Sequence, residues 1–325
     1  MRRRYLAYGS NLCLDQMRER CPAAEPGPVV ALSGWRFVIN RRGVATLLPC
    51  QGGQAWGLVW QLTRDCEATL DRYEGVASGH YAKAEIEAGG SPALLYLATE
   101  TAPGFPRPGY LDRVVAAATA RRLDAVYVAE LAAWTGAVTP ALVQHVLGGY
   151  RLPRDGIHGT AHWLRVLENG RTLAAAMPGA DPALVDLFAL LHDSQRRNEA
   201  GDPGHGERAA AYVRDLAAQG VLELGPERVA VLAAACARHE MGEVSADPTI
   251  GCCWDADRLE LARLGRRPIA RLLSTAAALD PGIQAAAWQR GTTGAVRADL
   301  ARAWSLDAAV PARRVARQSA LRAAV

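Results

Sequence analysis

The sequence predicts two domains, the first of the α+β class and the second all-α. At 325 residues the chain exceeds the length that a single hydrophobic core usually supports. Short segments rich in Val, Ile, Tyr and Trp occupy its first half, and longer segments with helical periodicity follow Thr139. We expect a first domain at 1–137, a linker or first helix at 138–153, a second domain at 154–305, and a basic helix or tail at 306–325.

The first domain is expected to be a sheet with a few helices. It opens on "RYLAYGSNL", a strand that leads into a Gly-Ser-Asn turn. Five further strand-like segments are separated by Gly or Pro: "GWRFVIN", "ATLLP", "AWGLVWQL", "YAKAEIEA" and "PALLYLA". Helices are predicted at about 13–21, 64–73, 108–120 and 124–134. This order predicts a mixed α and β domain whose sheet is closed or covered by helices.

Helix start signals mark the second half. Thr139-Pro140 and Asp181-Pro182 each pair a capping residue with proline at the first helical position. Apolar residues then recur with helical spacing in "ALVQHVL", "ALVDLFALLHD", "ERAAAYVRDLAAQG" and "RVAVLAAACARHE". Strand signals nearly vanish, and an all-α domain is therefore predicted.

Composition narrows the classes of function. The charged fraction of 22% and the net charge of +4 are ordinary for a globular protein, and without a basic-aromatic platform nucleic-acid binding is not expected. No apolar run approaches the roughly 20 residues of a membrane span, and Gly9, Ser10 and Asn11 interrupt the apolar start, so no signal peptide is expected. Seven cysteines without disulfide or zinc-finger spacing predict reduced thiols and a cytoplasmic protein.

One carboxylate in the first domain has a position that suits proton transfer. Thr63 is a predicted helix cap and Gly75 a predicted terminator, so Glu74 falls in the last helical turn. The negative end of the helix dipole is expected to raise the pKa of Glu74, as a general base near neutral pH requires. From spacing alone, an ordinary solvated glutamate is the alternative.

The first domain contains five segments in a fixed order: "YLAYGSNL", "GWRFVIN", "GVATLLP", "AWGLVWQLT" and "LDRYEGVASGHY". Together they resemble the γ-glutamylcyclotransferase-like (AIG2-like) family. The resemblance implies a small β-barrel-like fold, no cofactor, and release of 5-oxoproline from a small-molecule γ-glutamyl substrate. It also implies that Glu74 is the acid/base and that the substrate is held by Tyr8, Gly9, Ser10, Asn11, Leu12 and Tyr81. The amides of the Gly-Ser-Asn turn suit the charge that develops on a carbonyl oxygen, and Gly9 allows a close approach or an unusual φ.

Histidines gather in the second half. Five of the seven fall between residues 158 and 239, with the doublet His192-Asp193 and the Asp-rich segment "WDADRLEL". Imidazole and carboxylate groups without thiolate suit Mn, Fe, Mg, Ni or Zn, so a site for one or two divalent ions is expected.

The segments "HWLRV", "LLHDSQR" and "DADRLEL" resemble an HD-domain metal-dependent hydrolase. The resemblance implies His162, His192, Asp193 and Asp255 as ligands of one ion, with Asp255 on a long loop that Asp257 and Arg258 hold. It implies a second site completed by His205 and His239, with Asp193 as the bridge. The spacing from Asp193 to His205 is short for such a pair, which makes His205 the weakest assignment. His158 is expected beside the ligands or near the substrate.

Two reactions fit these ligands. A bridged metal pair roughly 3.5–4 Å apart suits displacement at phosphorus. Arg196 and Arg197 are then predicted to bind a phosphorylated small molecule, unless they only solvate a helix end. Activation of O₂ by two irons is the alternative. The chain is accordingly expected to be a bifunctional enzyme, or an enzyme in which one domain is a non-catalytic binding or regulatory module. The sequence does not indicate the oligomeric state.

Overall fold

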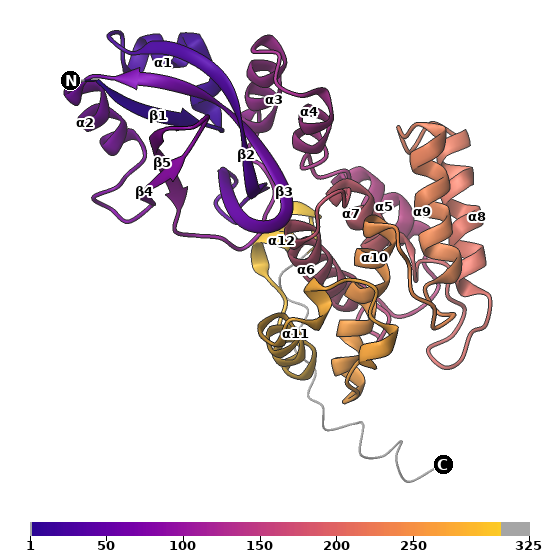
Figure 1. The fold of residues 1–325 in the computed structure, drawn as a ribbon. Coiled ribbons are helices and arrows are strands. Elements are labelled where there is room, and N and C mark those ends of the chain that lie inside the picture. Colours follow the sequence, from indigo (N-terminus) through magenta and orange to yellow (C-terminus); the bar gives the residue numbers. More distant parts are fainter. Residues whose placement is uncertain (1, 307–325) are drawn as a thin grey trace. The chain divides into compact units, whose positions relative to one another are not determined.

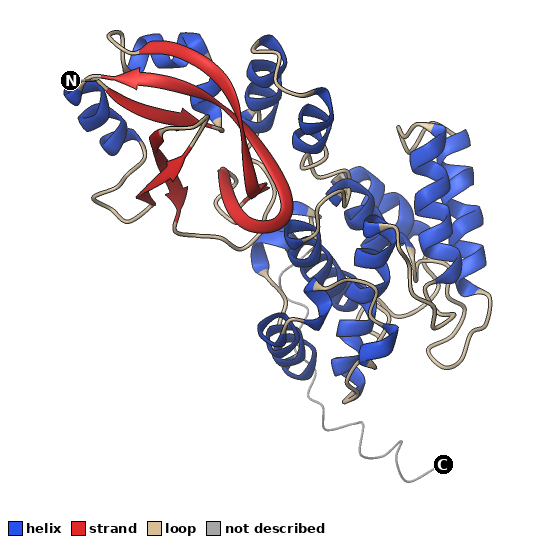
Figure 2. Cartoon of the chain, in the orientation of Figure 1, coloured by secondary structure: helices blue, strands red, loops and turns tan. Residues whose placement is uncertain are grey.

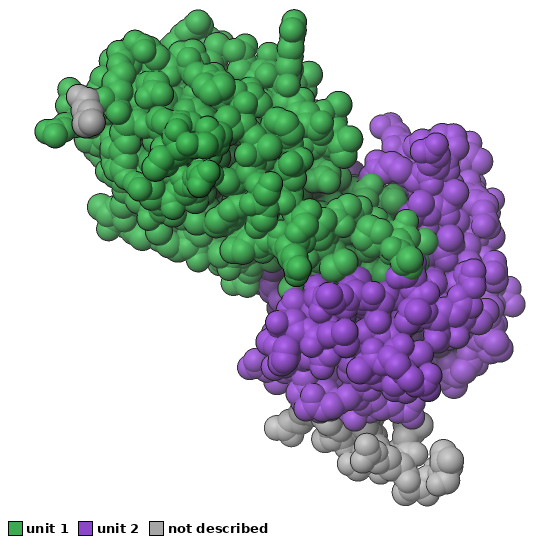
Figure 3. Space-filling view, viewed as in Figure 1, with its two compact units in different colours: residues 1–137, 171–187, 246–252 green, residues 138–170, 188–245, 253–325 purple. Residues whose placement is uncertain are grey.

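The computed structural model describes residues 2–306, and the chain folds into two compact units (Figure 3). Unit 1 comprises residues 1–137, 171–187 and 246–252, and unit 2 comprises residues 138–170, 188–245 and 253–325. Two segments from the predicted second domain, 171–187 and 246–252, therefore belong to unit 1. The predicted basic helix or tail at 306–325 lies outside the described residues, apart from Leu306.

Unit 1 is built on one five-stranded mixed sheet with the order β2-β3-β1-β5-β4 (Figures 1 and 2). The strands are β1 (Arg3–Ala7), β2 (Glu25–Ile39), β3 (Ala45–Leu62), β4 (Tyr81–Glu87) and β5 (Pro92–Ala98). β1 pairs antiparallel with β3 and parallel with β5. The expected barrel-like closure is not found among the described residues, because no ladder joins the edge strands β2 and β4.

The long hairpin of β2 and β3 replaces three predicted short strands. "ATLLP" and "AWGLVWQL" form one strand of 18 residues that continues through Gly52 and Gly53. A register shift between Ser33 and Trp35 surrounds Gly34, whose φ is 82°. Such a bulge bends a long hairpin, which Figure 1 shows curving away from β1.

Four helices and a 3₁₀ turn accompany the sheet: η1 (Ser10–Leu12), α1 (Leu14–Arg20), α2 (Arg64–Tyr73), α3 (Tyr110–Ala120) and α4 (Ala125–Ala132). The predicted ends of α2 are confirmed. The Thr63 side chain accepts a hydrogen bond from the Cys66 amide, and Gly75 has a φ of 64°. Glu74 is the C-cap residue of α2, and Leu70 of the same helix packs into the core with Leu6 and Val59.

The later segment of unit 1 brings a buried ion pair. Arg171 and Asp186 are 1% and 0% exposed, and Arg171 Nε donates to Asp186 Oδ1 at 2.8 Å. The Arg171 guanidinium also lies 3.8 Å from the centre of the Phe105 ring. Arg36 Nη2 donates to the carbonyl of Ala180 at 2.8 Å. Each charge therefore has a partner, without which its burial would be costly.

Unit 2 contains only helices and loops among its described residues, as expected for an all-α domain. Its elements include α5 (Pro140–Gly149), α8 (His205–Ala218), α9 (Pro226–Arg238), η2 (Glu260–Leu264), η3 (Ala270–Leu272), η4 (Ala277–Leu279), α11 (Pro281–Thr293) and α12 (Ala298–Ala303). Three helices have residues in both units: α6 (Thr160–Ala176), α7 (Pro182–Leu191) and α10 (Pro248–Leu259). None of the described helices is both long and apolar enough to span a membrane. No disulfide joins the seven cysteines, all of which lie in the described part.

Candidate active site and metal centre

A small pocket in unit 1 collects most of the residues predicted to bind substrate. Its lining comprises Tyr5, Tyr8, Gly9, Ser10, Asn11, Ala45, Glu74, Tyr81, Tyr96 and Tyr110. Leu12 is the exception to the prediction: it is fully buried in the hydrophobic core and does not line the pocket. It ends the 3₁₀ turn, so its side chain packs inward while Gly9, Ser10 and Asn11 border the pocket.

Glu74 is the only carboxylate in this lining. Burial raises the pKa of Glu74, and the raise persists although Arg20 and Asn11 act against it. The direction is the expected one, but its main cause is desolvation rather than the helix end. Asn11 Nδ2 donates to Glu74 Oε1 at 3.0 Å. A raised pKa and one held oxygen suit a carboxylate that exchanges a proton near neutral pH.

The Asn11 amide has a fixed orientation. Its Oδ1 accepts from Gln16 Nε2 and Arg20 Nη1, both at 2.9 Å. Because both partners are donors, the oxygen must point to them and Nδ2 to Glu74 and the Tyr5 hydroxyl, 2.9 Å away. Sequence reasoning missed Gln16 and Arg20, although both lie within ten residues of Asn11 on the following helix.

The tyrosines form a neutral, hydrogen-bonded wall. Tyr8 donates to the carbonyl of Tyr96 at 2.5 Å, and Tyr81 to the carbonyl of Ala45 at 2.9 Å. The Tyr110 hydroxyl accepts from the Ala45 amide at 3.1 Å. Burial raises the pKa of Tyr8, Tyr81 and Tyr110, so all three stay protonated at neutral pH.

Gly9 is needed for space rather than for a left-handed backbone. Its φ is −108°, but a Cβ there would lie 3.1 Å from the Tyr110 hydroxyl and 3.3 Å from Ala45 Cβ. The hydrogen bonds of the turn itself are donated by the backbone amides of Leu12 and Cys13 to the carbonyl oxygens of Gly9 and Ser10. The amides of Ser10 and Asn11 are thus left outside the turn's own bonds, as at any helix start.

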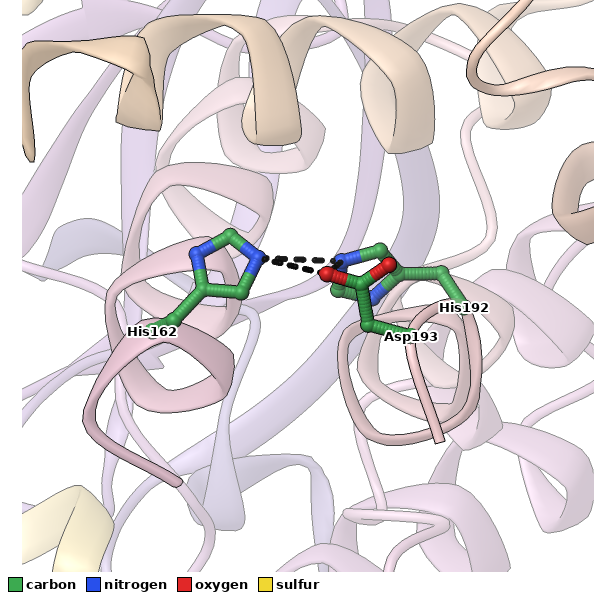
Figure 4. Close-up of side chains that lie close together, drawn as sticks. All are labelled: His162, His192 and Asp193. Carbon is green, nitrogen blue, oxygen red and sulfur yellow. Dashed lines mark hydrogen bonds and ion pairs between the residues drawn. The ribbon is translucent and has the colours of Figure 1, made fainter. Parts of the chain in front are cut away.

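In unit 2, a first cluster joins three predicted ligands. His162 lies on α6, and His192 and Asp193 follow the end of α7. His162 Nε2 is 3.2 Å from His192 Nε2 and 3.4 Å from Asp193 Oδ2 (Figure 4). His192 Nε2 is 3.6 Å from the same oxygen, and all three residues are buried.

A second cluster uses the other oxygen of Asp193. Asp193 Oδ1 is 3.2 Å from His205 Nε2 and 3.7 Å from His239 Nε2, and the two Nε2 atoms are 2.9 Å apart. His205 begins α8, and His239 is the C-cap residue of α9. The short spacing between Asp193 and His205 therefore does not keep them apart, and Asp193 lies where a bridging carboxylate would.

Three of the histidines direct Nε2 toward the clusters. Nδ1 of His192, His205 and His239 lies 3.1, 2.8 and 2.7 Å from the carbonyl oxygens of Phe188, Asp202 and Cys236, respectively. A carbonyl only accepts, so each Nδ1 carries a hydrogen, and each inward Nε2 is the atom that binds either a proton or a metal ion. Adjacent Nε2 atoms with no proton or ion between them would repel one another. The separations above are also the size expected for ligand atoms about 2.0–2.2 Å from one ion.

Asp257, not Asp255, is the second carboxylate of the first cluster. Asp257 Oδ1 lies 3.5 Å from His162 Nε2 and 3.8 Å from His192 Nε2. Burial alone would raise the pKa of Asp257, yet His192 and His162 lower it to about 2. The predicted ligand Asp255 instead accepts hydrogen bonds from the amides of Ser274 and Thr275 and from the Thr275 hydroxyl.

The two aspartates exchange their predicted roles because their segment is helical. "DPTIGCCWDADRLEL" was expected to be a long loop, but residues 248–259 form α10. Residues two apart on a helix point in nearly opposite directions, so only one of Asp255 and Asp257 can face the histidines. The spacing alone does not reveal which one.

Arg196 and His158 lie beside the clusters. Arg196 Nη1 is 3.1 Å from His205 Nε2 and 3.4 Å from Asp193 Oδ1, so a guanidinium borders the second cluster. A proton can also occupy that cluster: burial lowers the pKa of His239, but Asp193 outweighs burial and raises it. His158 Nδ1 contacts Glu199 Oε2 at 2.7 Å, outside both clusters.

Comparisons with known proteins concern the first part of the chain. Residues 54–131 match the AIG2-like family. The chain is 32% identical over 92 residues to "Gamma-glutamylcyclotransferase" of Bos taurus, a match that covers 25% of this chain and 49% of the relative. It is 31% identical over 93 residues to the Homo sapiens protein of the same name, covering 26% and 50%. The chain thus spans about half the length of the curated relatives it matches.

A solved structure is also similar to part of the chain. A structure titled "Gamma-glutamyl cyclotransferase" is 27% identical, with a TM-score of 0.39, and the match covers 41% of this chain and 88% of that chain. Together, the family and sequence matches support an AIG2-like, γ-glutamylcyclotransferase-like region in the first part of the chain.

Proposed function

We propose that unit 1 cyclises a γ-glutamyl compound to 5-oxoproline and releases an amine. The observation that carries this proposal is the Glu74 carboxylate, which has a raised pKa, lies in a pocket of neutral tyrosines and is held through one oxygen by Asn11. The similarity of this region to γ-glutamylcyclotransferases supports the substrate class.

The reaction needs little more than one such carboxylate. The substrate's α-amine attacks its own γ-carbonyl carbon, so the reacting groups are tethered, and this lowers the barrier by several kcal/mol. Glu74 takes a proton from the substrate's ammonium group and returns one to the leaving nitrogen as the C–N bond breaks. Charge that develops on the carbonyl oxygen is stabilised by the amides of Ser10 and Asn11.

The variant Glu74→Gln tests this role. We expect 5-oxoproline release from a γ-glutamyl dipeptide or from glutathione to fall by about 10²–10⁴-fold, because the amide cannot accept the proton. Product formation is measured by chromatography of the full-length protein. Undiminished release would exclude Glu74 from the mechanism.

Stability is the control for that variant. Burial raises the pKa of Glu74, so the folded protein favours the protonated carboxyl group and is destabilised by the ionised one. The stability that the protonated Glu74 contributes is present below the ordinary carboxyl pKa and is lost as pH rises through the raised pKa of the folded state. A neutral glutamine should therefore leave the melting temperature at pH 7 unchanged or higher. An inactive variant with a lowered melting temperature would point to a structural role.

For unit 2 we propose a metal-dependent hydrolase site that acts on a phosphorylated small molecule. The carrying observation is the convergence of four histidine Nε2 atoms on the two oxygens of Asp193. His162, His192, Asp193 and Asp257 would hold one divalent ion, and Asp193, His205 and His239 a second. Bound ions supply Lewis acidity and a nucleophilic water at neutral pH. Arg196 lies close enough to the second cluster to orient an anionic substrate group.

Metal analysis together with activity assays tests the metal site and separates a hydrolase from a di-iron oxygenase. In His192→Ala we expect loss of bound metal, measured by element-resolved mass spectrometry of the purified full-length chain, because a first-cluster ligand is gone. Unchanged metal content would refute the site. Phosphate release from phosphomonoesters with added Mn²⁺ or Mg²⁺ would support hydrolysis, whereas two tightly bound irons and O₂ consumption would favour an oxygenase.

A further inference from the structure

A small polar cavity in unit 2 has Arg196 in its lining, next to the proposed metal ligands. It measures about 40 Å³, and its polar lining includes Arg151, Arg196, Arg197 and Arg208. A cavity of this size holds more than one water molecule, for which about 10–15 Å³ suffices. Four arginines in the lining of so small a space form a site of concentrated positive charge.

The charge of this arginine pocket, defined by those four residues, is only partly neutralised. Arg208 Nη2 pairs with Asp202 Oδ2 at 2.7 Å. Arg196 lies 3.4 Å from Asp193 Oδ1 and donates to the carbonyl of Ala200 at 2.8 Å. Within residues 2–306 the exposed side chains of Arg151 and Arg197 make no hydrogen bond or ion pair. Two cations of the pocket therefore lack a counter-charge in that part of the chain.

The geometry points to a binding site for a tetrahedral oxyanion, a phosphate or phosphonate group, in the arginine pocket. Guanidinium groups donate in planar forks, and one or two of them satisfy a planar carboxylate, whereas a phosphate offers oxygens in four directions. The Ser194 hydroxyl, also in the lining, donates to the carbonyl of Leu191 and keeps its oxygen for accepting only. Arginine thus supplies every charged donor of the lining.

Arg196 connects the pocket to the clusters. Arg196 lines the pocket, and its guanidinium lies close to His205 and Asp193. An anionic group bound there would neutralise a cation that otherwise competes with metal at the second cluster. The catalytic relevance of this pocket rests on the proposed metal-dependent function of unit 2, but phosphate binding itself needs no metal.

Phosphate binding to the full-length protein tests the inference. Inorganic phosphate is titrated calorimetrically at about 0.15 M salt, where long-range effects of surface charges are screened. We expect one phosphate per chain, and a loss of affinity of at least about tenfold in the double variant Arg151→Gln/Arg197→Gln. Neither side chain has a partner to lose within residues 2–306, so the fold should be unaffected, and Arg214→Gln on α8 is the matched control that should bind like wild type.

Wild-type affinity in the double variant would overturn the site, and so would the absence of any phosphate binding. Loss of phosphate binding in His192→Ala would also overturn it, because phosphate would then be bound by metal rather than by arginine. Acetate should bind at least about tenfold more weakly than phosphate, and equal binding would contradict a tetrahedral site. Failure of the hydrolase proposal shows separately, as bound metal without phosphomonoesterase activity.

Discussion

The two units place carboxylates in opposite electrostatic surroundings. In unit 1, Glu74 lies among tyrosine hydroxyls, and burial raises its pKa. In unit 2, burial acts in the same direction on Asp193, yet His192, His162 and His205 hold the pKa of Asp193 well below its ordinary value. The first environment favours a group that takes and gives a proton. The second favours a permanent anion that can bind a cation.

The partners of the carboxylates explain the difference. Glu74 accepts a hydrogen bond from the neutral side-chain amide of Asn11, and the charged Arg20 in turn donates to the oxygen of that amide. Asp193 has imidazole groups on both oxygens. The same functional group therefore serves acid/base chemistry or ligation according to whether its neighbours are neutral donors or nitrogen ligands.

Among the substitutions that test this comparison, the largest effect is expected from Asp257→Asn. Replacing an anionic ligand with a neutral amide should weaken metal binding at the first cluster by at least about tenfold, the size seen even for groups that only support ligands. Metal affinity is measured by competition with a chelating dye. Unchanged metal affinity would show that Asp257 is not a ligand, so that either Asp255 or no second carboxylate binds the ion.

Asp255→Asn is the matched comparison, two residues away on the same helix. It should lower the free energy of unfolding by about 1–3 kcal/mol, because the amides of Ser274 and Thr275 lose an ionised acceptor. Its metal content should stay at the wild-type level when folded protein is assayed. Selective metal loss without a change in unfolding free energy would reverse the roles of the two aspartates.

The smallest effect is expected from Arg20→Gln. The Arg20 charge lowers the pKa of Glu74, so its removal should raise that pKa further. The acid limb of kcat/KM for 5-oxoproline release should then move to higher pH, because the base is protonated over a wider range. The plateau value of kcat/KM should fall by about tenfold or less, since Gln16 still donates a hydrogen bond to Asn11.

Arg20→Lys separates charge from hydrogen-bond geometry in that experiment. It keeps the cation, so its acid limb should stay near the wild-type position. An equal shift in both variants would assign the effect to the orientation of Asn11 instead of to charge.

The predictable parts of both sites are those set by short-range pattern. Thr63 and Gly75 delimit α2 and so place Glu74, and the doublet His192-Asp193 falls at the end of α7. Long-range pairing and helix phase were not predictable. The merging of two strands into β3 depends on pairing with β2, and the choice of Asp257 over Asp255 depends on the rotation of α10. Tyr5, Tyr96 and Tyr110 reach the pocket from separate elements, which no local pattern connects.

Unit 1 is discontinuous along the chain, and this affects the order in which it is completed during synthesis. Its sheet and first four helices are translated before residue 138, but the Ala180 carbonyl that Arg36 contacts and the Arg171 side chain that covers Phe105 come later. Until residues 171–187 have been synthesised, the Arg36 guanidinium lacks the Ala180 carbonyl as its acceptor. A gene shortened to the first 137 codons would encode every residue of the Glu74 pocket but would never supply that acceptor.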